Sequence, residues 1–591
     1  MKRSANRRRS PAAEQRKKQR REQLVKFLRL NTWLVLLAVL VLIALILLIL
    51  VLAGGRKAPV QEQEPAASKP YVRAWLCADT PEIAYYDADL KQSGTVARGR
   101  QVTYSTTDSF ERGGVTYYLT YLDVPQYGYI SEENLTEQER AVVQERKIYA
   151  RTPQNLRKAE DGIELGALVE QGTELTVLGY DYLTNGIVHL YHVSSNGKTG
   201  YISGSYTAAT YEDSMEVYDR FGVYMTHASR EDRYGGDAGS LYYYPTEKAS
   251  FAENVMPEHV YALYLTCDPK IISEIDEYIA YAKTTKINAF VVNIIDGTSV
   301  GYPSSVYDEY SPTTGKYANN TFEEYQTAIR KLKDAGFYVI GRLTTFNDSF
   351  FVTDHPEYGI NDKNGEPLYI ANSYWPSAFC RYVWEYKVAL AKEAVESMGF
   401  NEIQFDYVRF PDGTYQYEKN GNIDYHNTYD ETKAQAIQRF LMYAVEELHD
   451  LGVYVSADVF GETNNPYVTS YGQYWPAISN VVDVISGMPY PDHFAQDGNY
   501  RPWEHPYETL LDWGEKAAQR QEETPSPAIV RTWIQAYDAI KVPYNTYGAE
   551  EIADEIRALN ESGLTGGFMA WNASCSLEKL RSFQPAFDAL E

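Results

Sequence analysis

The sequence predicts an α/β chain whose C-terminal part folds as an eight-stranded (β/α)8, TIM-like barrel. One observation is a series of eight short apolar runs after Val260, rich in β-branched residues. The other is that stretches with helical periodicity separate them, several ending at Gly or Asn just before the next run. Continuous apolar strands that alternate with helices are typical of parallel βαβ units. Eight such units fit a closed barrel with enlarged loops.

The elements of this barrel follow one another along residues 257–591. An open doubly wound sheet is the alternative, but it more often carries a Gly-rich phosphate loop after an early strand, and this sequence has none there. The predicted strands are 261–266, 289–296, 338–346, 402–411, 453–461, 481–491, 528–537 and 566–574. The predicted helices are 271–285, 321–335, 381–398, 432–451 and 548–561.

The length and the net charge of the chain limit its domain organisation and its possible partners. Its 591 residues are too many for one domain, so several are expected. A formal net charge of -25 argues against a nucleic-acid partner, which favours a basic surface. Residues 1–30 nevertheless hold twelve Lys/Arg against two Glu, so this arm carries +10 and the remainder -35.

A membrane anchor is expected directly after the basic arm. Residues 33–53 form a run of 21 without a charged side chain, and about 20 helical residues span a bilayer core. The positive-inside rule keeps residues 1–30 in the cytoplasm, residues 31–53 form the single transmembrane helix, and the rest lies outside. A cleaved signal peptide is the alternative, and it also exports the remainder. Residues 54–70 are a polar Pro/Ala/Gln-rich linker.

Residues 71–208 contain two copies of one small β unit, predicted at 71–138 and 145–208. The second copy ends in NGKTGYISGSY (196–206), where two glycines mark turns around a short strand, and the first ends in QYGYISEENL (126–135). These endings resemble bacterial SH3-like domains. The resemblance implies modules that bind peptidoglycan or peptides, and a rigid spacer is the alternative. Residues 209–256 are a Tyr- and Gly-rich connector expected to wrap on the barrel.

Polar side chains gather at the carboxyl ends of the predicted strands, where barrel enzymes place their chemistry. They form an acidic cleft with aromatic walls. Neither a His/Cys cluster with metal-ligand spacing nor a Gly-x-Ser-x-Gly elbow is present, so no cofactor is expected and acid/base work falls to carboxylates. The candidate substrate-binding residues are Asp296, Arg342, Gln404, Arg409, Tyr490, Trp533, Gln535, Trp571 and Asn572.

Two acids are the strongest catalytic candidates. Asp406 and Asp458 lie near the ends of adjacent predicted strands, which are about 4.8 Å apart in parallel sheets, so their carboxyl groups can flank one bond. Glycoside hydrolysis needs such a pair, one acid protonating the leaving oxygen and the other attacking or activating water. Arg342 or Arg409 would keep one acid ionised. Glu462 is the alternative partner for Asp406.

The stretch 382–411, YVWEYKVALAKEAVESMGFNEIQFDYVRFP, resembles the hallmark of a family of barrel-fold glycoside hydrolases related to the α-amylase-like enzymes. The resemblance runs from about Val260 to the C-terminus, and FDYVRFP is its most distinctive part. It implies that Asp406 is the nucleophile or key carboxylate and Arg409 its neighbour. The SADVFG run implies that Asp458 is the partner.

Together these observations predict a membrane-anchored extracellular glycoside hydrolase that cleaves a cell-wall or exported polysaccharide. The alternative is a cell-surface protein that grips glycan without cutting it, and a third hypothesis gives the function to the SH3-like pair. Outside the cytoplasm, Cys267 and Cys575 could form a disulfide, because they follow the first and last strands, which a closed barrel makes neighbours.

Overall fold

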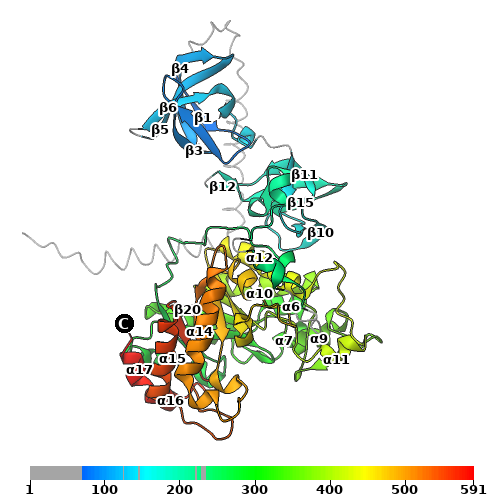
Figure 1. Ribbon diagram of the computed structural model, residues 1–591, viewed down its shortest axis with the longest axis vertical. Coiled ribbons are helices and arrows are strands. Elements are labelled where there is room, and N and C mark those ends of the chain that lie inside the picture. The colour runs from blue at the N-terminus through cyan, green and yellow to red at the C-terminus, as the bar shows by residue number, and fades with distance from the viewer. Residues whose placement is uncertain are drawn as a thin grey trace, which may run out of the picture. The chain divides into compact units, whose positions relative to one another are not determined.

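The protein is described by a computed structural model that covers residues 70–590, except 124–125, 144–146, 185, 220–221 and 228–234. The basic arm, the predicted transmembrane helix and most of the linker therefore lie outside the described residues. Among the helices that are described, none has the length and apolar character needed to cross a bilayer. The residues from Val72 onward form one compact unit, with two β modules preceding a C-terminal barrel (Figure 1).

The two β modules have one topology used twice. Each is a seven-stranded sheet, and the strand orders β3-β2-β6-β5-β4-β1-β7 and β10-β9-β15-β14-β11-β8-β16 correspond position by position. Each encloses its own small apolar core. The first contains β1 (Tyr71–Leu76), β2 (Glu82–Tyr86), β3 (Gln92–Ala97), β4 (Gln101–Arg112), β5 (Val115–Asp123), β6 (Gln126–Ser131) and β7 (Leu135–Thr136). The second contains β8 (Lys147–Ala150), β9 (Gln154–Arg157), β10 (Leu165–Val169), β11 (Glu174–Tyr180), β14 (Leu190–Ser195), β15 (Lys198–Ser203) and β16 (Thr207–Ala208), with the hairpin β12 (Leu183–Thr184) and β13 (Ile187–Val188) inserted.

The described part of the connector, within residues 209–256, packs on the barrel domain. Its described part holds the short helix α3 (Tyr211–Ser214) and little other regular structure. Tyr224 and Tyr243 stack with ring centroids 3.6 Å apart and share a core cluster with Val468 and Tyr474 of the barrel domain. The tyrosine-rich composition of this segment therefore serves burial against the barrel.

Parallel pairing joins the barrel strands in the order β26-β25-β24-β23-β20-β18-β17-β28-β27. The seventh strand is interrupted at Arg531: β26 pairs with β25, β27 pairs with β28, and this shared strand closes the ring. All eight predicted strands are present. They are β17 (Val260–Leu265), β18 (Ala289–Asp296), β20 (Tyr338–Thr344), β23 (Glu402–Asp406), β24 (Tyr454–Phe460), β25 (Val484–Met488), β26 (Ile529–Val530) with β27 (Thr532–Gln535), and β28 (Gly567–Trp571). The short β19 (Ser299–Val300) is added to β18, and β21 (Tyr369–Ile370) pairs with β22 (Ser373–Tyr374) in a loop.

Helix signals in the sequence correspond to the observed helix ends. Capping boxes at Thr321 and Thr432 start α8 and α12, and Gly399, with φ of 78°, ends α10. The barrel helices are α4 (Pro269–Ser273), α5 (Ile275–Ala282), α6 (Ser305–Tyr310), α7 (Pro312–Gly315), α8 (Phe322–Asp334), α9 (Ser349–Asp354), α10 (Arg381–Met398), α11 (Tyr415–Lys419), α12 (Lys433–His449), α13 (Trp475–Ser479), α14 (Pro506–Glu522), α15 (Ala549–Glu561), α16 (Leu577–Ser582) and α17 (Gln584–Asp588).

The interior of the barrel is mostly apolar but includes a fully buried ion pair between β23 and the seventh strand. Arg531 donates to both carboxylate oxygens of Glu402, at 2.8 and 3.0 Å, and neither side chain is exposed. The disulfide considered for Cys267 and Cys575 is absent, and both thiols are free. Cys267 Sγ lies 3.3 Å from Ser299 Oγ, and Cys575 Sγ accepts from the Thr266 amide.

Candidate active site

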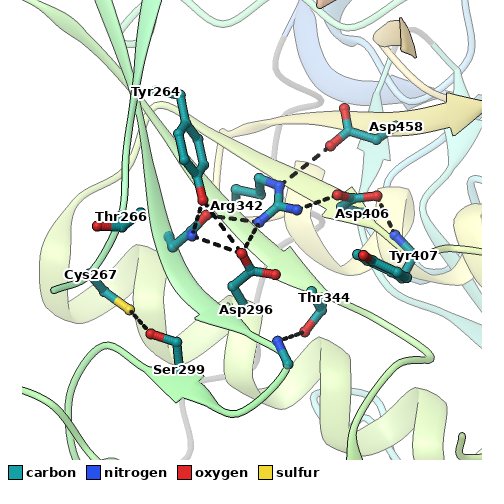
Figure 2. A network of polar contacts seen from close by, with 12 residues as sticks. Tyr264, Thr266, Cys267, Asp296, Ser299, Arg342, Thr344, Asp406, Tyr407 and Asp458 are labelled. Carbon is teal, nitrogen blue, oxygen red and sulfur yellow. Dashed lines mark hydrogen bonds and ion pairs between the residues drawn. The ribbon is translucent and has the colours of Figure 1, made fainter. Parts of the chain in front are cut away.

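Arg342 is the centre of a charged cluster at the carboxyl ends of β18, β20, β23 and β24. It lies on β20, and the parallel register places it beside Asn293 and Gln404. Its Nη2 donates to Asp406 Oδ2, its Nη1 lies 3.5 Å from Asp296 Oδ2, and its Nε lies 3.8 Å from Asp458 Oδ2. One guanidinium therefore contacts three carboxylates from three strands, as Figure 2 shows.

Asp406 ends β23 with its carboxylate held from two sides. Oδ2 accepts from Arg342, and Oδ1 accepts from the amide of Tyr407 at 2.5 Å. Tyr407 has a φ of 50°, so the chain turns out of the strand immediately after the acid. Asp406 is 5% exposed. One guanidinium and one backbone amide therefore fix the position of this carboxyl group.

Asp458 on β24 has the opposite environment. Its side chain is fully buried, Oδ1 accepts a 2.8 Å hydrogen bond from Trp533 Nε1, and Oδ2 has no hydrogen-bond partner among the described residues. Burial and the nearby charge of Asp406 raise the pKa of Asp458 well above its usual range, although Arg342 and the Trp533 bond oppose the shift. Two neighbouring acids in unlike environments are a common arrangement for acid/base chemistry.

Two residues of the cluster had no assigned role in the sequence prediction. Asn293 accepts from Arg342 Nη1 at 2.9 Å and donates to Tyr264 Oη at 2.6 Å and to Asp296 Oδ2 at 3.3 Å. Tyr264, on β17, donates weakly to the same Asp296 oxygen at 3.4 Å. In the sequence, Asn293 lies within an apolar strand run, and Tyr264 resembles any other apolar strand position. These contacts fix the arginine, while the side chain of Asp296 remains 35% exposed.

Aromatic rings form one side of the cluster. Tyr264 lies edge-on to Trp533 with ring centroids 6.0 Å apart and also contacts Trp571. Trp571 contacts Tyr490 and Tyr537 at 5.5 and 5.1 Å. The sequence prediction of aromatic walls from strands six to eight is therefore consistent with this geometry. Apolar ring surface beside paired carboxylates can pack against the hydrophobic face of a sugar and exclude water.

Arg409 lies three residues after Asp406 and does not contact that carboxylate. Its Nη1 donates to the carbonyl of Phe410 at 2.9 Å, and its guanidinium is enclosed by aromatic rings. The carbon Cζ lies 4.1 Å from the ring centroid of Phe460, 5.0 Å from Trp375, 5.2 Å from Tyr407 and 5.8 Å from Tyr471. Arg342, not Arg409, is therefore the arginine that pairs with Asp406.

The remaining predicted residues lie near strand ends but contact other groups. Glu462 is exposed after β24 and accepts from Tyr467 at 2.8 Å and Tyr471 at 3.1 Å. Gln404 lies deeper, donating to Met569 Sδ at 3.2 Å. The amides of Gln535 and Asn572 bond to Asp492 and to Ala536 within the protein. The structure thus brings together Asp296, Arg342, Asp406, Asp458 and Trp533 out of the predicted set.

Comparison with known proteins gives a family. The model of a family described as "Putative glycosyl hydrolase domain" matches residues 262–577. No curated protein matches the chain. Among solved structures, a hypothetical protein from Ruminiclostridium thermocellum ATCC 27405 is 33% identical over 33% of this chain and 97% of its own, with a TM-score of 0.28.

Two further solved structures are more distant in sequence. The glycoside hydrolase domain of PgaB (BpsB) from Bordetella bronchiseptica is 13% identical over 57% of this chain and 100% of its own, with a TM-score of 0.40. The GH20 exo-β-N-acetylglucosaminidase from Vibrio harveyi is 12% identical over 57% and 55%, with a TM-score of 0.36. The family match spans more than half of the 591 residues and includes every member of the charged cluster. The chain therefore belongs to this family of glycosyl hydrolase domains.

Proposed function

We propose that this protein is a membrane-anchored extracellular glycoside hydrolase that cleaves a cell-wall or exported polysaccharide with Asp458 as proton donor and Asp406 as the second carboxylate. The observation that carries this proposal is the bridging of the two acids by Arg342, which pairs closely with Asp406 and only loosely with Asp458. Glycoside hydrolysis needs one protonated and one ionised carboxyl group on either side of the bond.

Asp458 suits the role of general acid because burial and the nearby charge of Asp406 raise its pKa, which favours the protonated form. Its side chain has no exposed surface here, so the donor must become accessible when substrate enters. Buried Tyr490, whose ring contacts Trp571, belongs to the wall that would have to shift. Catalytic hydrogen bonds commonly tighten only in the substrate complex, and closure around a sugar fits that behaviour.

Asp406 suits the role of nucleophile or of base for a water molecule. Arg342 and the Tyr407 amide hold its carboxyl group from two sides, which fixes it for either role. As positive charge develops at the anomeric carbon, a fixed carboxylate stabilises it without having to reorient. Asp296 accepts hydrogen bonds beside it and keeps a partly exposed side chain, so it is placed to bind a sugar hydroxyl.

The cellular setting of the proposal comes from the sequence. The apolar run 33–53 and the basic arm before it support a bilayer anchor with the barrel outside the cell. An exported barrel of this family would meet surface polysaccharides. The SH3-like ending of each β module supports a role for the pair in holding peptidoglycan or peptides near the barrel.

The proposal is tested with exported polysaccharides and aryl glycosides as substrates. Asp406→Asn should abolish turnover of both, typically by more than about 1000-fold, while glycan binding persists. Asp458→Asn should also abolish cleavage of the polysaccharide. It should retain much of its activity on an aryl glycoside with an acidic phenol, because that leaving group needs no proton donor.

Glu462→Gln is the matched control, because it removes a neighbouring carboxylate after the same strand. If it shows the leaving-group dependence expected of Asp458→Asn, the proton donor is Glu462 and our assignment is wrong. If the wild type binds glycans but cleaves none, the chain is a glycan-binding protein instead.

A further inference from the structure

The two arginines at the carboxyl end of the barrel are partnered in opposite ways. Arg342 contacts Asp296, Asp406 and Asp458. Arg409 forms no ion pair within the described part of the chain, and its one hydrogen bond goes to the adjacent carbonyl of Phe410. Arg409 is nevertheless only 6% exposed. A buried cation lowers the stability of the fold unless an anion compensates its charge. The described part of the chain supplies no such anion to Arg409, so an external anion can fill this role.

The free edge of Arg409 has the geometry to bind an anion. Nη1 is the atom that bonds Phe410, which leaves Nε and Nη2 without hydrogen-bond partners in the described structure. Both nitrogens keep some solvent-accessible surface, because neither belongs to the fully buried polar atoms that lack a hydrogen-bond partner. Nε and Nη2 share one edge of the planar guanidinium, and that edge binds a carboxylate or phosphate through two parallel hydrogen bonds.

The aromatic rings hold the guanidinium in place. Phe460 ends β24, Tyr471 lies in the loop beyond it, and Trp375 lies in the segment before α10, so three parts of the chain surround the guanidinium. The Phe410 amide donates to Tyr471 at 2.9 Å and anchors the loop that carries the arginine. Cation–π contacts compensate part of the charge but supply no hydrogen-bond acceptor in the plane of the guanidinium, which an anion would provide.

Arg409 is also close to the reacting groups. Tyr407 joins the two sites, since its amide donates to Asp406 while its ring lies 5.2 Å from the Arg409 guanidinium. Asp406 is already paired with Arg342, and Asp412, the other acid whose charge acts on Arg409, is exposed. The positive charge of Arg409 is therefore available to a group on the substrate.

We propose that Arg409 forms a subsite for an anionic substituent, a carboxylate or a phosphate, on a sugar bound beside Asp406, so that the substrate is an acidic polysaccharide. This inference rests on the proposed hydrolase function for its substrate. Binding at the subsite can be measured without turnover, which separates the two ideas.

The test measures dissociation constants of glucose, glucuronate and glucose 6-phosphate for the full chain by titration calorimetry. The wild type should bind at least one acidic sugar roughly tenfold or more tightly than glucose. Arg409→Gln should bring that sugar to the level of glucose, and Arg409→Lys, which keeps the charge but not the fork, should retain a smaller preference. Arg330→Gln, at an exposed arginine on α8, is the control and should behave as wild type.

The three ligands also identify the anion. Tighter glucuronate assigns a carboxylate, and tighter glucose 6-phosphate assigns a phosphate. Equal binding of all three to the wild type, or a preference that Arg409→Gln leaves unchanged, overturns the subsite. If Arg409→Gln does not fold, as judged by its melting curve, an undiminished preference in Arg409→Lys overturns it as well.

The hydrolase proposal is judged separately. Cleavage of a neutral polysaccharide by a wild type without preference for acidic sugars would leave that proposal standing and remove the subsite. If the wild type prefers acidic sugars but cleaves no polysaccharide, the subsite stands and the hydrolase proposal is wrong.

Discussion

The indole nitrogen of Trp533 donates a 2.8 Å hydrogen bond to Oδ1 of Asp458. This bond favours the ionised carboxyl group, so it opposes the burial and the Asp406 charge that raise the pKa of Asp458. Trp533→Phe should therefore raise that pKa further. If Asp458 is the proton donor, the alkaline limb of the pH profile of kcat/KM should move to higher pH, because the acid keeps its proton longer.

The control for this variant is Trp503→Phe, which removes an indole hydrogen bond to the carbonyl of Pro543, outside the charged cluster. Its pH profile should match the wild type even if its stability falls. An alkaline limb that stays in place in Trp533→Phe would exclude Asp458 as the group that controls it.

Asp458→Asn should stabilise the protein at neutral pH. The folded-state pKa of Asp458 is raised, so below the unfolded-state pKa both states hold the proton and the stability cost is absent. As the pH rises from the unfolded-state pKa towards the folded-state pKa, only the unfolded state releases the proton, and wild-type stability falls. An Asn carbonyl keeps the Trp533 bond without this cost.

The measurement is the melting temperature of both proteins between pH 5 and pH 8. We expect the variant to melt about 2–4 °C higher at pH 8, with the difference shrinking as the pH falls. A difference that grows on acidification would mean that Asp458 is ionised in the fold.

The strand-end acids could be predicted because parallel strands are buried on both faces. Such strands appear as apolar runs, and a carboxylate at the end of a run marks the mouth of the barrel. Asp406 and Asp458 were found in this way, and their contacts to one guanidinium agree with their predicted adjacency. The membrane anchor and the SH3-like identity of the modules remain predictions.

Contacts made between distant loops carried no local signal. Trp375 reaches Arg409 from a segment before α10, and no sequence pattern places it there. Glu402 and Arg531 face each other inside the barrel, whereas period-two alternation only indicates that each shares a face with other residues of its own strand. Which charge meets which across a barrel depends on strand order and register, and a single sequence does not specify the register.

The Glu402–Arg531 pair should show strong coupling in a double-mutant cycle. Both side chains are fully buried, and Tyr338 donates to the same carboxylate at 3.0 Å. Arg531→Met alone leaves a buried, unpaired carboxylate and should cost about 3–5 kcal/mol of unfolding free energy. Arg531→Met with Glu402→Gln removes both charges and should cost clearly less than the sum of the single variants. Additive losses in urea unfolding would show that the two charges do not interact.

The junction between the second β module and the barrel should depend on Arg157. On β9, its Nη2 lies 2.7 Å from Glu446 and its Nη1 3.0 Å from Glu447, both on α12, and the arginine side chain is 5% exposed. Arg157→Met leaves two poorly solvated carboxylates and should lower the unfolding free energy by about 3 kcal/mol or more.

The adjacent residue supplies the control, because Lys158 pairs with Glu164 at 3.1 Å with side chains 59% and 63% exposed. Lys158→Met should leave the urea midpoint nearly unchanged, since solvent screens that pair. Both variants remove one positive charge, so the difference between their urea midpoints measures the effect of burying the ion pair. Equal small losses would mean that the second module contributes little to the stability of the barrel.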